Sequence, residues 1–321
     1  MREESDVSIK LLQDEVSISR VIADLGNSNR GNTLMLVGGT HGNELMGIGA
    51  IQRVVAYLEE HDLELNGRLL AITGNMEACR LGQRYLYQDL NRMWTRENLD
   101  DLHYNRLDLR HTENHELSVV YHHLKEAIDV TTGQFVLIDL HTTSSPTIPF
   151  VVTNFFPKSI EFVQPLPLPV IGGLSGFLDG TLLSYVNELG HIGMAYEAGQ
   201  HQSPLALESH ESFIWTMLEH TGILKDSEDA RLAYHRQSLA GSSKHISGNF
   251  KIISRYRIRE DENFRMLPGF ENFQPVKKGE ELAQNDEGSI HSPYDGYIFM
   301  PLYQSRGNDG FFLIAPLNAD A

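Results

Sequence analysis

The sequence predicts an α/β fold, in which helices flank a mixed, largely parallel sheet, followed by a small all-β domain. Apolar runs that read as buried strands, such as Thr33–Val37 and Arg68–Thr73, enclose a segment of helical period at Met46–Leu58. A strand, a helix and a strand at this spacing form a βαβ unit with parallel strands. Nearer the C-terminus, short alternating runs separated by turn residues are typical of β structure. We therefore expect one domain over residues 1–245 and a second over residues 246–321.

Composition limits the class of protein. The 321 residues are 41% hydrophobic and 21% charged, which is ordinary for a globular protein with a large core and excludes disordered and fibrous classes. The first thirty residues are charged throughout, and no apolar run approaches the roughly 18 residues of a membrane span. We therefore expect a cytoplasmic protein that has no membrane partner.

The charge balance limits the partners. A net charge of −17 gives nucleic acid no electrostatic attraction, so we expect no nucleic-acid partner. An anionic substrate would need a local cluster of arginines. The single cysteine, Cys79, fits a reducing compartment and is more typical of a structural thiol than of a nucleophile. The sequence leaves a homo-oligomer open.

The first candidate site follows the apolar run that ends at Val37. Two glycines and a threonine lead to His41, and Glu44 lies three positions later, just before the predicted helix. Imidazole nitrogen and carboxylate oxygen are zinc ligands, and a catalytic zinc site uses three protein ligands and leaves a position for water. The pair predicts two of the three ligands. The alternative is a chance pairing in which His41 is an ordinary loop histidine.

The segment after the second strand is polar where a core element would be apolar. It contains Asp89, Asn91 and Arg92 within four positions. Arginine offers a planar fork of donors to a carboxylate, asparagine offers an amide donor, and an aspartate can hold an arginine in place. This arrangement suits the binding of a substrate carboxylate. An exposed loop stabilised by ion pairs is an equally good interpretation of these residues alone.

A third apolar strand, Gln134–Leu140, ends at His141, which supplies the missing third ligand. Asp139 lies two residues earlier on the same face of this strand. It could therefore orient the imidazole of His141 from behind and fix its tautomer. We expect the other histidines of this part of the chain to be surface residues: His111, His115, His122 and His123.

A carboxylate follows the apolar strand that ends at Tyr196. Glu197 is followed by Ala-Gly, and a carboxylate at the end of a buried strand needs a reason to be there. A general base that takes a proton from an attacking water, and then returns it to the leaving nitrogen, supplies one. The structural alternative is an ion pair with an arginine.

Four motifs, in this order, resemble the succinylglutamate desuccinylase/aspartoacylase family, a branch of the zinc carboxypeptidase superfamily: Gly-Gly-Thr-His-Gly-Asn-Glu, Asp-Leu-Asn-Arg, Asp-Leu-His-Thr-Thr and Glu-Ala-Gly. The resemblance spans about Thr33 to Glu208. It implies a zinc carboxypeptidase-like fold and one zinc per chain. It implies that His41, Glu44 and His141 bind the zinc and that Glu197 is the general base and acid. It also implies that Arg84 polarises the scissile carbonyl. Asn91 and Arg92 would then bind the substrate carboxylate.

The chain departs from the family pattern at one position. Aspartoacylases of the mammalian type have an arginine upstream of the catalytic glutamate, where it helps to hold the substrate, and Asn187 stands there in this sequence. A second carboxylate on the substrate should therefore gain little. It could gain more if Arg80, or an arginine of the C-terminal domain, reached the pocket.

These expectations converge on a zinc-dependent hydrolase that cleaves the amide bond of an N-acylated amino acid, a small-molecule substrate with a free carboxylate. Two alternatives stay open, a metallocarboxypeptidase acting on a short peptide and a non-catalytic metal-binding or small-molecule-binding protein of the same fold. Two C-terminal segments, Lys277–Glu280 and Ser292–Gly296, resemble the turns of biotinyl and lipoyl modules. No lysine has the context of a carrier hairpin, so we expect this domain to cap the mouth of the active site.

Overall fold

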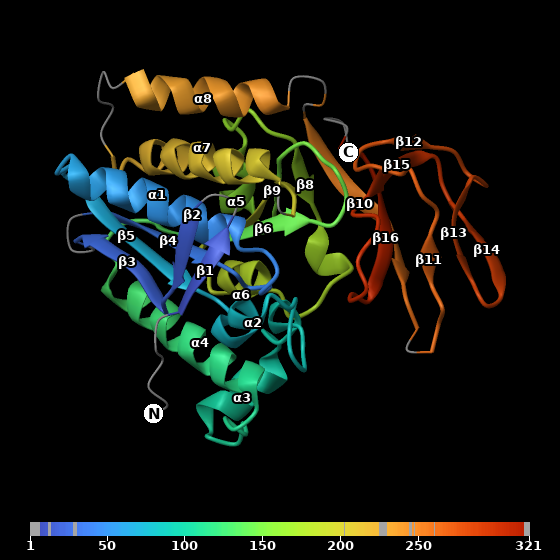
Figure 1. The fold of residues 1–321 in the computed structure, drawn as a ribbon, viewed down its shortest axis with the longest axis horizontal. Coiled ribbons are helices and arrows are strands. Elements are labelled where there is room, and N and C mark those ends of the chain that lie inside the picture. The colour runs from blue at the N-terminus through green and yellow to red at the C-terminus, as the bar shows by residue number, and fades with distance from the viewer. Residues whose placement is uncertain are drawn as a thin grey trace.

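The computed structural model describes residues 7–11, 14–27, 31–201, 203–224, 230–243, 246, 248–259 and 261–317. Its main element is an 11-stranded sheet with the order β12-β15-β16-β10-β8-β7-β9-β6-β4-β5-β3. Helices lie on both faces of this sheet (Figure 1). The mixed α/β architecture predicted from the sequence is confirmed.

Four neighbouring strands of the sheet run parallel to one another. They are β4 (Asn32–Gly38), β5 (Gly67–Thr73), β6 (Phe135–Thr143) and β9 (Ile192–Gln200). β4 pairs with both β5 and β6, and β6 pairs with β9, in each case parallel. Because these strands are covered on both faces, their sequences are nearly continuous apolar runs.

The helices of one face pack in two layers. α1 (Met46–Glu60) and α7 (Pro204–His220) lie on the sheet, and α8 (Ala230–Ser242) lies on α7 (Figure 1). In α1, the apolar residues at helical spacing are the buried ones, as predicted. α5 (Pro157–Val163) contributes Val163 to the same core.

The opposite face is covered by α4 (Thr112–Val130) and α6 (Leu182–Glu188). Shorter helices connect these layers: α2 (Met76–Leu81), η2 (Leu90–Arg92), α3 (Arg96–His103) and η3 (Leu174–Gly176). At the N-terminal end, β1 (Val7–Leu11) and β2 (Asp14–Ile18) form a separate hairpin. β3 (Val21–Gly26) is antiparallel to β5 at the sheet edge.

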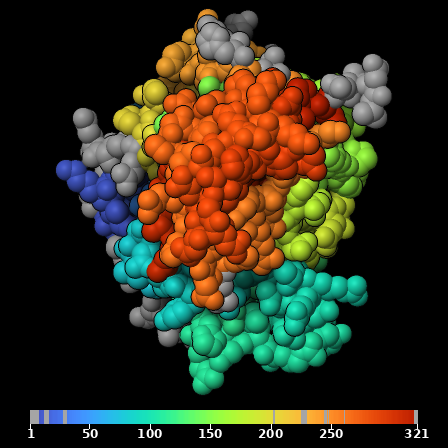
Figure 2. Space-filling model, turned by 90° about the vertical axis from the view of Figure 1, so that its right-hand side faces the viewer, coloured from blue at the N-terminus to red at the C-terminus, as the bar shows by residue number. Residues whose placement is uncertain are grey.

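The C-terminal region consists of strands, as predicted; most of them pair antiparallel, and they extend the large sheet. β10 (Asn249–Arg257) pairs in parallel with β8 (Val170–Gly172), which lies beside β7 (Phe150–Val152). β16 (Asp309–Pro316), β15 (Gly296–Phe299) and β12 (Pro275–Val276) follow. A three-stranded sheet contains β11 (Arg265–Met266), β13 (Glu281–Asn285) and β14 (Gly288–His291). These strands cover one end of the molecule (Figure 2).

The boundary between residues 245 and 246 stays a prediction, because residues 244, 245 and 247 lie outside the described part of the chain. Among the described residues, no helix is long and apolar enough to cross a membrane.

Candidate active site

The predicted metal ligands meet at the carboxyl ends of β4 and β6. His41 lies in the loop after β4, Glu44 lies just before α1, and His141 lies near the end of β6. All three side chains are buried, and one ligand atom from each lies within 4.8 Å of the other two. The residues come together because β4 and β6 are parallel neighbours, so their carboxyl ends share one edge of the sheet.

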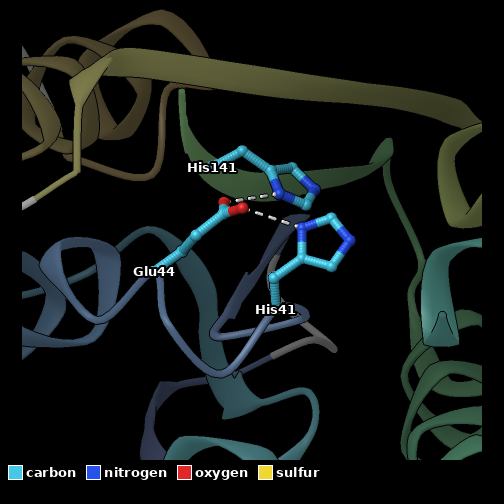
Figure 3. A group of neighbouring side chains, drawn as sticks. All are labelled: His41, Glu44 and His141. Atoms are coloured by element: carbon cyan, nitrogen blue, oxygen red, sulfur yellow. Dashed lines mark hydrogen bonds and ion pairs between the residues drawn. The ribbon is translucent and has the colours of Figure 1, made fainter. Parts of the chain in front are cut away.

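The two imidazoles face one carboxylate with the same ring nitrogen. Nδ1 of His41 is 2.9 Å from Oε1 of Glu44, and Nδ1 of His141 is 3.0 Å from Oε2 of Glu44 (Figure 3). Burial by itself would raise the pKa of Glu44, but the two histidines outweigh it and hold this pKa well below its usual range. Two nitrogens and a carboxylate are a donor set that zinc accepts. The residues therefore fit a divalent cation.

A carboxylate also lies behind each imidazole. Oδ2 of Asp139 is 2.8 Å from Nε2 of His141, as the sequence predicted, and Thr40 donates a hydrogen bond to Oδ1 of the same aspartate. Oδ1 of Asp89 is 3.0 Å from Nε2 of His41. A proton held at Nε2 leaves the lone pair of Nδ1 free for a metal. Both imidazoles are thus oriented toward the same point.

Arg84 lies beside the metal ligands. Its Nη1 donates to Oε1 of Glu44, and its Nη2 donates to Oδ2 of Asp89, both at 3.3 Å. Asp89 therefore holds an arginine, as expected, and also orients His41, which sequence reasoning did not anticipate. Arg84 itself was indicated only by the family resemblance, since nothing in its spacing marks it.

Glu197 is buried on β9, where it pairs in register with His141 of β6. Burial raises the pKa of Glu197 to about 8. Within the described residues its Oε2 is buried and has no hydrogen-bond partner. The positive charge of Arg84 acts to lower this pKa, so the alternative of an ion pair with an arginine stays open.

These residues line one cavity of about 130 Å³. The wall opposite the metal ligands is largely apolar. A C-terminal segment that lies between β15 and β16 also lines the cavity, through Met300, Pro301, Leu302, Gln304, Gly307 and Asn308. That the C-terminal strands narrow the mouth of the site stays a prediction.

Asn91 and Arg92 also line the cavity. Asn91 accepts a hydrogen bond from the backbone of Leu182 at 3.0 Å, and its amide nitrogen is 3.4 Å from Nε2 of His141. Arg92 donates to Oδ2 of Asp309 at 3.2 Å. Sequence reasoning missed Asp309, because Asn308-Asp309-Gly310 reads as an ordinary turn.

Asn187 and Arg80 do not line the cavity. The amide nitrogen of Asn187 instead donates to Oγ of Ser159 at 3.0 Å, inside the core around α6. Arg80 donates to Glu77 in its own helix. Asn187, which stands where the resemblance would place an arginine upstream of the catalytic glutamate, is therefore buried away from the cavity.

The four histidines expected at the surface are exposed or half-buried: His111, His115, His122 and His123. In the part of the chain that the structure describes, His41, Glu44 and His141 form the single group of three or more metal-ligating side chains.

The catalytic-domain model of the succinylglutamate desuccinylase/aspartoacylase family matches residues 30–220. The chain belongs to this family. Membership makes the protein a hydrolase of the acylamino acid class, and enzymes of this class depend on zinc in general.

Individual relatives differ in how much of the chain they match. A probable aspartoacylase of Acaryochloris marina is 26% identical over 281 residues, which is 86% of this chain and 82% of that protein. A succinylglutamate desuccinylase of Pseudomonas aeruginosa PAO1 is 36% identical over 73 residues, which is 23% of this chain and 22% of that protein. The similarity to the latter is local.

Solved structures of the family share the fold. A succinylglutamate desuccinylase of Vibrio parahaemolyticus superposes with a TM-score of 0.67 at 14% identity, covering 98% of this chain and 93% of the other. The ectoine utilization protein EutE (DoeB) of Ruegeria pomeroyi gives 0.63 at 16% identity, covering 97% and 93%.

The metal site predicts a simple pattern of zinc content. The protein should bind about one zinc per chain, and His41→Ala and His141→Ala should each lose most of it, because every ligand removed leaves two. Metal analysis of the purified variants measures this, with exposed His111→Ala as the control. Unchanged zinc in both ligand variants would contradict the assignment.

The loop that carries His41 and Glu44 depends on Gly42. A Cβ at this position would lie 2.0 Å from the backbone carbon of Ala78, so a larger residue must push the loop away from α2. Gly42→Ala should weaken zinc binding by roughly tenfold or more, in the range of lost supporting contacts at metal sites. In the control Gly176→Ala, the added Cβ meets no atom within 4 Å. Equal zinc affinities, measured by competition with a chelator, would show that the loop tolerates displacement.

Proposed function

We propose that the protein is a zinc-dependent hydrolase that removes the acyl group from an N-acylated amino acid. In this proposal His41, Glu44 and His141 hold the metal, and Glu197 is the general base and acid. The observation that carries the proposal is the carboxylate of Glu197, which is buried without a hydrogen-bonding partner for Oε2 in the same cavity as the three ligands. A buried, unpaired carboxylate is costly and is more typical of a reacting group than of a structural one.

Bound zinc would polarise the scissile carbonyl and make a water more acidic. Glu197 can accept the proton of the attacking water, because burial raises the pKa of this carboxyl and so strengthens it as a base. The same carboxyl can then donate the proton to the leaving nitrogen. Arg84, held in place by Glu44 and Asp89, is suited to stabilise the negative charge that develops on the carbonyl oxygen.

The free carboxylate of the substrate is assigned to Arg92, with Asn91 beside it. Arg92 is half-buried at the cavity, and its contact with Asp309 fixes the guanidinium before a ligand arrives. Only its two Nη atoms have protein partners in the described residues, so N–H donors remain for a substrate.

Two alternatives are weaker. The metallocarboxypeptidase has less support because the family whose model matches the chain is named for succinylglutamate desuccinylase and aspartoacylase, which act on acylamino acids. A non-catalytic binding protein would have no use for the unpaired carboxylate of Glu197. A cytoplasmic location, a homo-oligomer and the division at residue 245 stay predictions from the sequence.

Glu197→Gln tests the assignment of the base. The change preserves shape but removes the proton acceptor, so kcat on N-acetyl amino acids should fall by roughly 10² or more. Zinc content should stay at the wild-type level, because Glu197 is not a ligand in this proposal. Near-normal turnover would place the base elsewhere.

Arg92→Ala tests the carboxylate site. A charge-assisted contact contributes roughly 1.5–3 kcal/mol, so kcat/KM should fall about tenfold to a hundredfold on substrates with a free carboxylate. The corresponding neutral amides should hardly be affected. Arg96→Ala is the control, since Arg96 is exposed and lies outside the cavity. An equal loss on acids and amides would show that Arg92 has a structural role instead.

A further inference from the structure

The cavity has two chemically different sides. One side carries the metal ligands, Arg84 and Glu197. The other is formed by six buried side chains, here called the apolar wall: Val152, Leu174, Leu178, Leu183, Ala195 and Phe312. They come from β7, η3 and the residues after it, α6, β9 and β16, which are far apart in the sequence.

The apolar wall begins next to the reacting centre. β7 and β9 are antiparallel, with Phe150 opposite Glu197 and Val152 opposite Ala195. Directly paired residues point to the same face, and so do residues two apart on one strand. Val152 and Ala195 therefore lie on the same face as Glu197, roughly 7 Å along the strand.

The apolar wall also adjoins the carboxylate site. Asn91 accepts its hydrogen bond from the backbone of Leu182, the neighbour of Leu183. Asp309, which holds Arg92, lies three residues before Phe312 on β16. A substrate whose carboxylate binds Arg92 would therefore place the side chain of its amino acid next to the apolar wall.

The charges at this end of the cavity suit one carboxylate. Asp309 accepts from Arg255 at 2.6 Å as well as from Arg92, so two positive charges face one negative charge. The three groups together therefore carry one net positive charge. Among the described residues that line the cavity, Arg84 is the other lysine or arginine, and Glu44 and Asp89 already neutralise it. A second carboxylate against the apolar wall would have no lysine or arginine as a partner among these lining residues, which is costly.

We propose that the amino acid released by this enzyme carries an uncharged, apolar side chain, which packs against the apolar wall while its α-carboxylate binds Arg92. This substrate class rests on the proposed deacylase function and narrows it. Leucine, methionine and phenylalanine have such a side chain, whereas aspartate and glutamate do not.

The direct test compares substrates on the zinc-loaded protein. We expect kcat/KM for N-acetyl-L-leucine or N-acetyl-L-methionine to exceed that for N-acetyl-L-aspartate and N-acetyl-L-glutamate by about tenfold or more, the scale of side-chain discrimination by a pocket. A preference for the doubly charged substrates would overturn the inference and leave the deacylase function intact.

A matched pair of variants tests the position of the apolar wall. Leu183→Ala enlarges the cavity and should raise the ratio of kcat/KM for N-acetyl-L-phenylalanine over N-acetyl-L-leucine severalfold. Leu182→Ala removes an equally buried side chain that faces the other core and does not line the cavity, so the ratio should stay unchanged. The ratio is insensitive to a partial loss of folded protein. An unchanged ratio in Leu183→Ala would contradict the inference.

Calorimetry of free amino acids separates this inference from the proposed function. If no N-acyl amino acid were hydrolysed, the deacylase function would fail, but binding of the free acids to the zinc-loaded protein would still report on the cavity. L-leucine should then bind more tightly than L-aspartate, and Leu183→Ala should weaken its binding more than Leu182→Ala does. Tighter binding of L-aspartate would overturn the inference.

Discussion

The carboxylate of Glu44, buried between two imidazoles, is the interaction on which the rest of the site depends. A buried negative charge is tolerated only when opposite charge or hydrogen bonds compensate it, and here His41, His141 and the backbone N–H of Thr142 do so. Asp89 and Asp139 in turn fix the two imidazoles. This network ties the ends of β4 and β6 together and directs its donor atoms to one point, where a divalent cation would complete the charge balance.

The sheet places further side chains around this network, and together they line the cavity. β9 follows β6 in the sheet and places Glu197 opposite His141, while β7 and β9 provide an apolar surface on the same face. Because hydrogen bonds continue from β8 to β10 and β16, the C-terminal strands are held in register with the central ones. Asp309 and the segment from Met300 to Asn308 therefore line the cavity, although they lie more than two hundred positions after His41 in the sequence.

Much of the fold and of the candidate site could be predicted, because the signals were local. Each ligand follows an apolar run that stops abruptly, so parallel pairing alone brings His41 and His141 together. α8 was missed, since only Leu232, His235 and Leu239 of this helix are buried, too few to show a period in a polar segment. The apolar wall and Asp309 had no signal, because tertiary packing assembles them from distant elements. Asn187 could not be placed from the sequence, because its contact with Ser159 inside the core depends on tertiary packing.

If the two Nδ1 atoms and Glu44 hold one metal ion that faces Glu197, anomalous diffraction from crystals, measured on both sides of the zinc absorption edge, will locate it. We expect a single strong peak at roughly 2.0–2.2 Å from Nδ1 of His41, Nδ1 of His141 and an oxygen of Glu44. A peak bound through the Nε2 atoms or by other residues, or no peak in zinc-loaded crystals, would contradict this expectation.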